Sequence, residues 1–232
     1  MSITAKDVNE LRKKTGAGMM DCKKALTESN VDMEKAINFL KKKGQKIAAK
    51  RGDRDAREGL VISKSHNEYG YLLCLNCETD FVAKNDDFGT FANSLVDIAM
   101  KSESNTLEDL LNQKYESSQL TVKEKITEQS GVIGEKIEIS AFEKITAKKV
   151  VAYNHPGNQI ATIVGLTIDE EEVGKQVAMQ VAAMNPIALD QQSVSQDVID
   201  REIEVGKDLA IQEGKPVEMA EKIAKGRLNK FF

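Results

Sequence analysis

The sequence predicts an α+β protein, and three observations carry that prediction. Apolar residues recur at helical spacing in the first fifty residues. From Gly59 the pattern changes to the alternation typical of strands, and a hairpin followed by a helix occurs twice. Residues 195–232 then return to helical spacing. A chain of 232 residues is long enough to bury a sizeable core around these elements.

Three short helices are predicted at the N-terminus. Thr4 and Asp7 have the spacing of a capping box, and Asp32 is placed to cap a later helix. Two glycines within residues 15–18 predict a tight turn. Residues 1–55 are therefore expected to form a three-helix domain that ends in a basic linker. Its apolar stripe consists of Val8, Leu11, Cys22, Ala25, Leu26, Met33, Ala36, Ile37 and Leu40.

A first hairpin and helix follow this domain. The hairpin is expected over residues 59–77, with its turn near His66, and Asn85 is placed to cap the helix. Residues 106–134 have a helical pattern, and a strand is expected to begin at Lys136. We assign these elements to a first core subdomain over residues 56–140.

The same order recurs in a second subdomain over residues 141–194. A hairpin is predicted for residues 148–168 and a helix for residues 170–184. We interpret the recurrence as an internal duplication, against the alternative that two simple patterns agree by chance. The second copy is five residues shorter between strand and helix.

The last segment, residues 195–232, predicts two helices that fold back on each other. The break lies at Gly214-Lys215-Pro216, where proline occupies a permitted helix start. Short-linked helices with narrow apolar stripes favour an antiparallel helical hairpin of the coiled-coil kind.

Charge and hydropathy limit the classes of function. The net charge is −4, no apolar run approaches the ~20 residues that span a membrane, and the first residues lack a signal-peptide core. A cytoplasmic protein without a membrane partner is expected.

Residues 41–57 form a basic stretch with eight Lys or Arg and two acidic residues. Such a basic run is also compatible with an RNA-binding arm, but it contains no aromatic residue for base stacking. We therefore favour a solvated helix end and linker, with no direct nucleic-acid contact.

Chemistry-bearing motifs point away from an enzyme. The chain has three cysteines and two histidines, and no phosphate loop, nucleophile elbow or zinc-protease motif. Cys74 and Cys77 form a lone C-x-x-C within a predicted strand, where side chains three apart face opposite sides. Buried small side chains are favoured over a zinc or redox site. We expect no metal and no cofactor.

The five extra residues of the first copy are the most informative feature. Residues 79–85 connect strand and helix, and Phe81, Val82 and Ala83 are apolar within them. Phe81 is either a plug over its own core or an anchor presented to a partner. Because the second copy lacks these residues, its scaffold closes without them, which favours the anchor. Met19 and Met20 pose a similar choice, since adjacent helical residues cannot both face one small core.

Two long motifs resemble one known family. LRKKTGAGMMDCKKAL, from Leu11 to Leu26, and NCETDFVAKND, from Asn76 to Asp86, resemble bacterial elongation factor Ts. The resemblance covers essentially the whole chain. It implies a guanine-nucleotide exchange factor for elongation factor Tu, with an N-terminal ubiquitin-associated-like (UBA-like) domain, a duplicated core and an antiparallel coiled coil. It also implies a further C-terminal module on which full affinity for the partner depends.

The resemblance also implies roles for individual residues. Thr79, Asp80, Phe81 and Val82 match the loop that enters the GTPase domain of the partner and helps to dislodge its Mg²⁺. His155 matches a contact near the partner's third domain, with Pro156 here where the family pattern has glycine. The matched N-terminal contacts are Arg12, Met19, Met20 and Lys23.

Overall fold

The computed structural model describes residues 3–115 and 118–231. It combines helices with small antiparallel sheets, which confirms the α+β class. The chain divides into two units, Met1–Ala182 and Ala183–Phe232. Within the described part of the chain, none of the helices combines the length and the apolar character needed to cross a membrane.

Three helices open the first unit: α1 (Ala5–Thr15), α2 (Met19–Glu28) and α3 (Met33–Arg51). The predicted caps are confirmed, because Thr4 forms a capping box with Asp7 and Asp32 accepts from the Lys35 N–H. Gly16 ends α1 with a φ of 69°, a left-handed conformation that glycine adopts without a steric penalty. The buried side chains between the helices are those of Val8, Leu11, Ala17, Cys22, Ala25, Leu26 and Ala36.

Only residues 52–57 of the basic stretch connect α3 to β1, so the expectation that the linker begins near residue 41 was wrong. Helix α3 continues through the basic stretch as far as Arg51. Its second half packs against α7 (Val122–Ile133), with Gly44 facing Gly131. Lysine and alanine are good helix formers, so the segment stays helical although it carries few apolar residues. The three-helix domain is thereby joined to the core by a packed helix.

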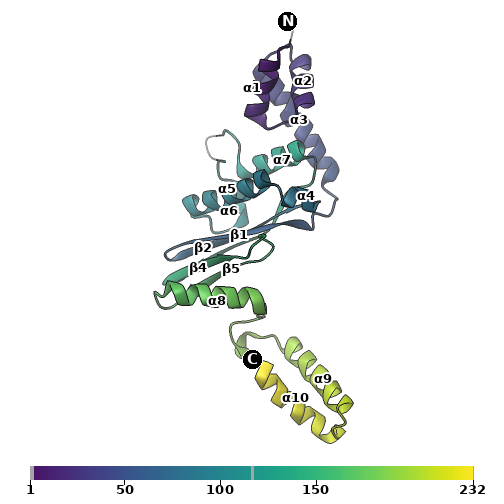
Figure 1. Ribbon diagram of the computed structural model, residues 1–232, viewed down its shortest axis with the longest axis vertical. Helices are drawn as coiled ribbons and strands as arrows, with labels where there is room; N and C mark the ends of the chain where they lie inside the picture. The colour runs from purple at the N-terminus through teal and green to yellow at the C-terminus, as the bar shows by residue number, and fades with distance from the viewer. Residues whose placement is uncertain (1–2, 116–117, 232) are drawn as a thin grey trace. The chain divides into compact units, whose positions relative to one another are not determined.

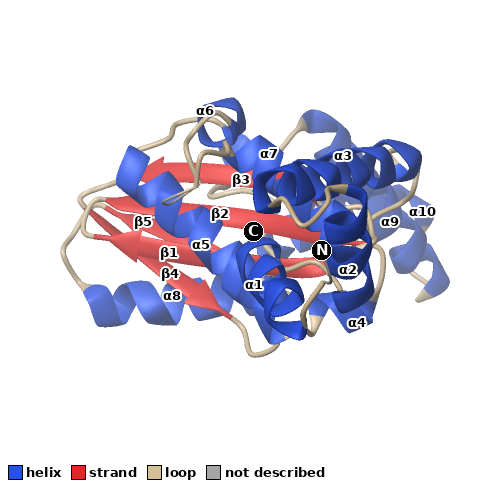
Figure 2. Cartoon of the chain, turned by 90° about the horizontal axis from the view of Figure 1, so that it is seen from above, coloured by secondary structure: helices blue, strands red, loops and turns tan. Residues whose placement is uncertain are grey.

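The first sheet has the order β1-β2-β3, with β1 (Glu58–His66), β2 (Tyr69–Cys77) and β3 (Glu138–Thr146) all antiparallel. Leu73 of β2 lies opposite Ile62 on one side and Phe142 on the other. Helices α5 (Asp86–Ser102), α6 (Leu107–Leu111) and α7 cover one face of this sheet (Figure 2).

Two predicted boundaries differ in the structure. Residues 106–134 form two helices rather than one continuous helix, and α7 begins with a capping box between Thr121 and Glu124. The boundary between residues 140 and 141 falls inside β3, whose pairing with β2 extends to Thr146. The strand therefore belongs to the first sheet along its whole length.

The second repeat lies on the other face of the first sheet. It contains β4 (Lys149–Asn154), β5 (Ala161–Leu166) and α8 (Glu171–Met184), in the predicted order. Figure 1 shows the layers, with α5 to α7 on one side, the two sheets in the middle and α8 on the far side. Both repeats thus place a helix on the outer face of a hairpin.

The turn of the second hairpin caps the free edge of β1. The Asn154 side chain accepts from the Ser63 N–H at 2.7 Å and donates to the Ser63 carbonyl at 2.8 Å. The Asn158 carbonyl accepts from the Val61 N–H at 2.7 Å, and the Gln159 amide donates to the Gly59 carbonyl at 3.0 Å. Four backbone groups of β1 that point away from β2 are therefore paired.

The second unit contains a short 3₁₀ turn (Gln191–Ser193) and the helices α9 (Gln196–Gln212) and α10 (Val217–Phe231). The two helices fold back on each other after the predicted break at residues 214–216 (Figure 1). Small side chains face each other between them, and a Cβ added to Gly206 would lie 3.0 Å from the Ala224 Cβ.

Candidate functional site

The connection between β2 and α5 is a single helical turn, α4 (Asp80–Ala83), rather than an irregular loop. Its apolar side chains divide between two directions. Val82 and Ala83 pack against the core beneath α4, whereas Phe81 is 84% exposed. The structure therefore contradicts the interpretation of Phe81 as a plug over its own core. A helical turn presents it instead as an isolated aromatic side chain.

Two carboxylates hold the entry to this turn. Glu135, which follows α7, accepts from the backbone N–H groups of Glu78 and Thr79 and from the Thr79 hydroxyl. Glu78 accepts from the Lys136 N–H and from the Arg51 guanidinium. Sequence analysis did not find these residues, because Glu135 lies more than fifty positions along the chain and no local pattern links it to Thr79.

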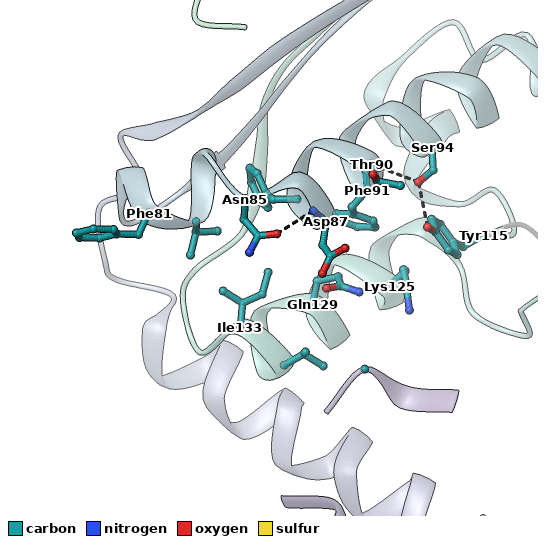
Figure 3. Close-up of a pocket in the computed structure, with 14 residues that line it drawn as sticks. Phe81, Asn85, Asp87, Thr90, Phe91, Ser94, Tyr115, Lys125, Gln129 and Ile133 are labelled. Carbon is teal, nitrogen blue, oxygen red and sulfur yellow. Dashed lines mark hydrogen bonds between the residues drawn. The ribbon is translucent and has the colours of Figure 1, made fainter. Parts of the chain in front are cut away.

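An apolar groove of about 750 Å³ runs beside α4. Phe81 projects at one end of it, and a hydrogen bond of 3.0 Å joins Ser94 to Tyr115 at the other (Figure 3). Gly16, in the turn between α1 and α2, also lines the groove. The N-terminal helices therefore reach the surface that carries Phe81.

A second, more polar groove of about 900 Å³ lies on the other side of α4. Asp80 and Lys84 line it together with residues 157–159 of the second hairpin turn. His155 is exposed at the start of this turn, and its Nδ1 lies 2.9 Å from the Tyr153 hydroxyl. The structure thus brings α4 of the first repeat and the hairpin turn of the second repeat to one end of the core.

The other predicted contact residues are accessible. Arg12, Met19, Met20 and Lys23 are all exposed, with Met19 at 57% and Met20 at 75%. Two adjacent exposed methionines on α2 form an adaptable apolar surface. The expectation that at least one of them lies outside the small core is confirmed.

Asp80 forms an ion pair within α4. Its carboxylate lies 2.7 Å from the Lys84 ammonium, and this hydrogen bond, with the Lys84 charge, lowers the pKa of Asp80. The pair is ionised at neutral pH and is open to solvent. The negatively charged Asp80 therefore directly precedes Phe81, the exposed aromatic residue, in the sequence.

Cys74 and Cys77 lie on β2, as predicted, and their thiols point to different partners. Cys74 donates to the Asn76 side chain and Cys77 to the Thr79 carbonyl. Burial, followed by the nearby Glu135 charge, raises the pKa of the Cys77 thiol to about 11. Among residues 3–115 and 118–231, no cluster of three histidine, cysteine or acidic side chains is arranged to hold a metal ion.

An exposed aromatic residue on a turn that is fixed by hydrogen bonds, with a groove on each side, is the kind of surface that binds another macromolecule.

Comparison with known proteins identifies the family. The family model described as elongation factor TS matches residues 78–232. Elongation factor Ts of Christiangramia forsetii is 53% identical over 235 residues, which cover 99% of this chain and 84% of that protein. The proteins of the same name from Amoebophilus asiaticus and Flavobacterium psychrophilum are 50% and 48% identical, with 85% of each covered.

The chain belongs to the elongation factor Ts family. Membership assigns it a nucleotide-exchange role in translation elongation.

Proposed function

We propose that the chain binds elongation factor Tu in its GDP-bound form and promotes release of the GDP, so that GTP can bind. The observation that carries this proposal is the exposure of Phe81 on α4. Scattered exposed apolar residues are common on proteins. This one is an aromatic ring on a turn that the second repeat does without, and such aromatic anchors dominate many interfaces.

The proposed mechanism is a wedge. Bound Mg²⁺ requires near-ideal octahedral geometry between nucleotide phosphates and protein oxygens. When Phe81 enters the GTPase domain beside the phosphate site, it shifts the groups that complete this geometry. Asp80 adds a negative charge near the metal, while Thr79 and Val82 fix the turn from which both residues project. No covalent bond is made or broken, so the acceleration concerns dissociation alone.

Binding of the nucleotide and of this chain must then oppose each other. If the chain weakens the affinity for GDP by some factor, GDP weakens the affinity for the chain by the same factor. Excess GTP displaces the chain and completes the cycle. We assign Arg12, Met19, Met20 and Lys23 to contacts with the GTPase domain, and His155 to a contact with another part of the partner.

Release of a fluorescent GDP analogue from elongation factor Tu tests the proposal directly. The rate should rise with the concentration of the chain and reach a plateau. Calorimetry should show tight binding to nucleotide-free elongation factor Tu and weaker binding once GDP and Mg²⁺ are added. Equal affinity with and without GDP would contradict an exchange mechanism.

A further inference from the structure

Packing of the Phe81 ring does not determine the direction in which this side chain points, because the residue is 84% exposed. This direction is set by the backbone that leads into α4. Thr79 is the N-cap residue of this turn, yet its hydroxyl makes no capping bond to the turn. The hydroxyl donates instead to Glu135 Oε1 at 2.6 Å.

Glu135 therefore holds the residues that precede the turn. Its Oε2 accepts from the backbone N–H groups of Glu78 and Thr79, each at 3.0 Å. Hydrogen bonds to an ionised acceptor are about twice as strong as neutral ones. One carboxylate thus forms three such bonds at the base of α4.

Glu78 extends the same connection to the N-terminal helices. Its Oε1 accepts from the Lys136 N–H at 2.7 Å, and the Arg51 Nη1 donates to both of its oxygens, at 2.9 and 2.7 Å. Burial opposes ionisation of Glu78, but these bonds outweigh it and lower the pKa of the carboxyl. Arg51 is the last residue of α3, so the end of that helix is attached to the base of the turn.

We propose that Glu135, supported by the Glu78–Arg51 pair, is a positioning residue for nucleotide exchange, which aims Phe81 and fixes its place relative to the N-terminal helices. This inference rests on the proposed function. It adds residues outside the Thr79–Val82 segment to the exchange machinery. Misplacement of a reacting or wedging group by about 1 Å can cost about a hundredfold in rate, so the hold on the turn bears directly on exchange.

Glu135→Gln tests the inference with little change in side-chain shape. An amide has one acceptor oxygen, so it cannot accept from all three donors. We expect the plateau rate of GDP release to fall about tenfold, while the concentration of the chain that gives half of that rate stays the same. Glu138→Gln is the matched control, because Glu138 pairs with Lys136 and not with residues 78 or 79. Its plateau rate should equal that of the unaltered chain.

Thr79 supplies a second pair of variants if Glu135→Gln folds poorly. Thr79→Val removes the hydroxyl that donates to Glu135 and should slow release, whereas Thr79→Ser keeps the hydroxyl and should restore the rate. Equal rates for the valine and serine variants would overturn the proposed role of this bond.

The double variant Phe81→Ala/Glu135→Gln separates positioning from a general structural role. If Glu135 acts through Phe81, the double variant releases GDP no more slowly than Phe81→Ala alone. The inference would be overturned if the fold-decrease in the release rate of the double variant equalled the product of the two single decreases. It would also be overturned if Glu135→Gln had a normal plateau rate while Phe81→Ala released GDP slowly. A normal rate for Phe81→Ala itself would instead overturn the proposed function.

Discussion

Gly44 of α3 and Gly131 of α7 meet where the two helices cross, and the contact is not symmetric. A Cβ added to Gly131 would lie 2.2 Å from the Gly44 Cα, whereas a Cβ added to Gly44 would have its nearest atom, the Gly131 Cα, at an ordinary 3.5 Å. Backbone meets backbone at this point, so nothing flexible can move aside for a side chain on Gly131.

Substitution of the two glycines by alanine should therefore affect the free energy of unfolding differently. Gly131→Ala forces the helices apart and should lower the free energy of unfolding by about 1–3 kcal/mol. Gly44→Ala should leave it unchanged or raise it by up to about 1 kcal/mol, because alanine favours a helix interior. Urea unfolding of both variants measures the difference. Similar free energies of unfolding for the two variants would show that the helices do not cross with backbone against backbone at Gly131.

Phe81→Ala should separate function from stability. The exposed ring contributes little to the folded state, so the melting temperature should stay nearly unchanged. GDP release should slow by about one to two orders of magnitude, since loss of an aromatic anchor commonly costs about 2 kcal/mol or more. A thermal melt and a release assay on the same sample provide the comparison.

Val82→Ala is the contrasting variant on the same turn. Val82 packs against the core, so its truncation should lower the free energy of unfolding by about 1 kcal/mol. Its effect on release, per folded molecule, should be smaller than that of Phe81→Ala. The reverse ranking would mean that the inward face of α4, rather than Phe81, carries the activity.

Asp80→Asn should change stability by less than about 0.5 kcal/mol, because its ion pair with Lys84 is exposed. Release should slow on the order of threefold, and the effect should shrink as salt is added, since salt screens exposed charges. Rates measured at low and high ionic strength check this. A loss that does not depend on salt would point to a steric role for Asp80.

The Cys77 thiol should make stability fall at high pH. Burial raises its pKa in the folded chain to about 11 from an ordinary value of 9.0. Between these two pH values the unfolded chain loses the proton first, so the folded chain binds more protons and the free energy of unfolding decreases as pH rises. The expected loss is about 2 kcal/mol.

Cys77→Ala is the control for this titration, because lysine and tyrosine side chains also lose protons in the same range. Alanine lowers stability at every pH through lost packing, so only the slopes are compared. The unaltered chain should lose stability more steeply than the variant as pH rises from about 9 to about 11. Parallel curves would show that Cys77 ionises as freely as in the unfolded chain.

Local signals predicted the parts of the fold that local physics determines. The caps at Thr4 and Asp32 and the break near Pro216 each depend on neighbours in the sequence, and the structure confirms them. The break within residues 106–134 also had a local signal, the Thr121–Glu124 capping box, which the helical pattern around it obscured.

Long-range packing determined what the sequence did not reveal. The second half of α3 is attached to the core because Gly131 of α7 admits α3 at close range, a contact that joins segments far apart in the chain. The same holds at the candidate site. Phe81 stood out by its type and place, but residues 79–85 alone did not show whether it faced inward or outward, because the turn that carries it is bonded to Glu135, which lies beyond the end of α7.

The pairing between the second hairpin turn and β1 has a consequence for aggregation. A bare sheet edge offers unpaired N–H and C=O groups to strands of other molecules. Here Asn154 pairs with both the N–H and the carbonyl of Ser63, and Asn158 pairs with the N–H of Val61. The later repeat thus shields this part of the edge of β1 from strands of other molecules. A nascent chain that has released β1 and β2 but not yet residues 149–166 would carry this edge uncovered, and would depend on rapid arrival of the second hairpin to remain monomeric.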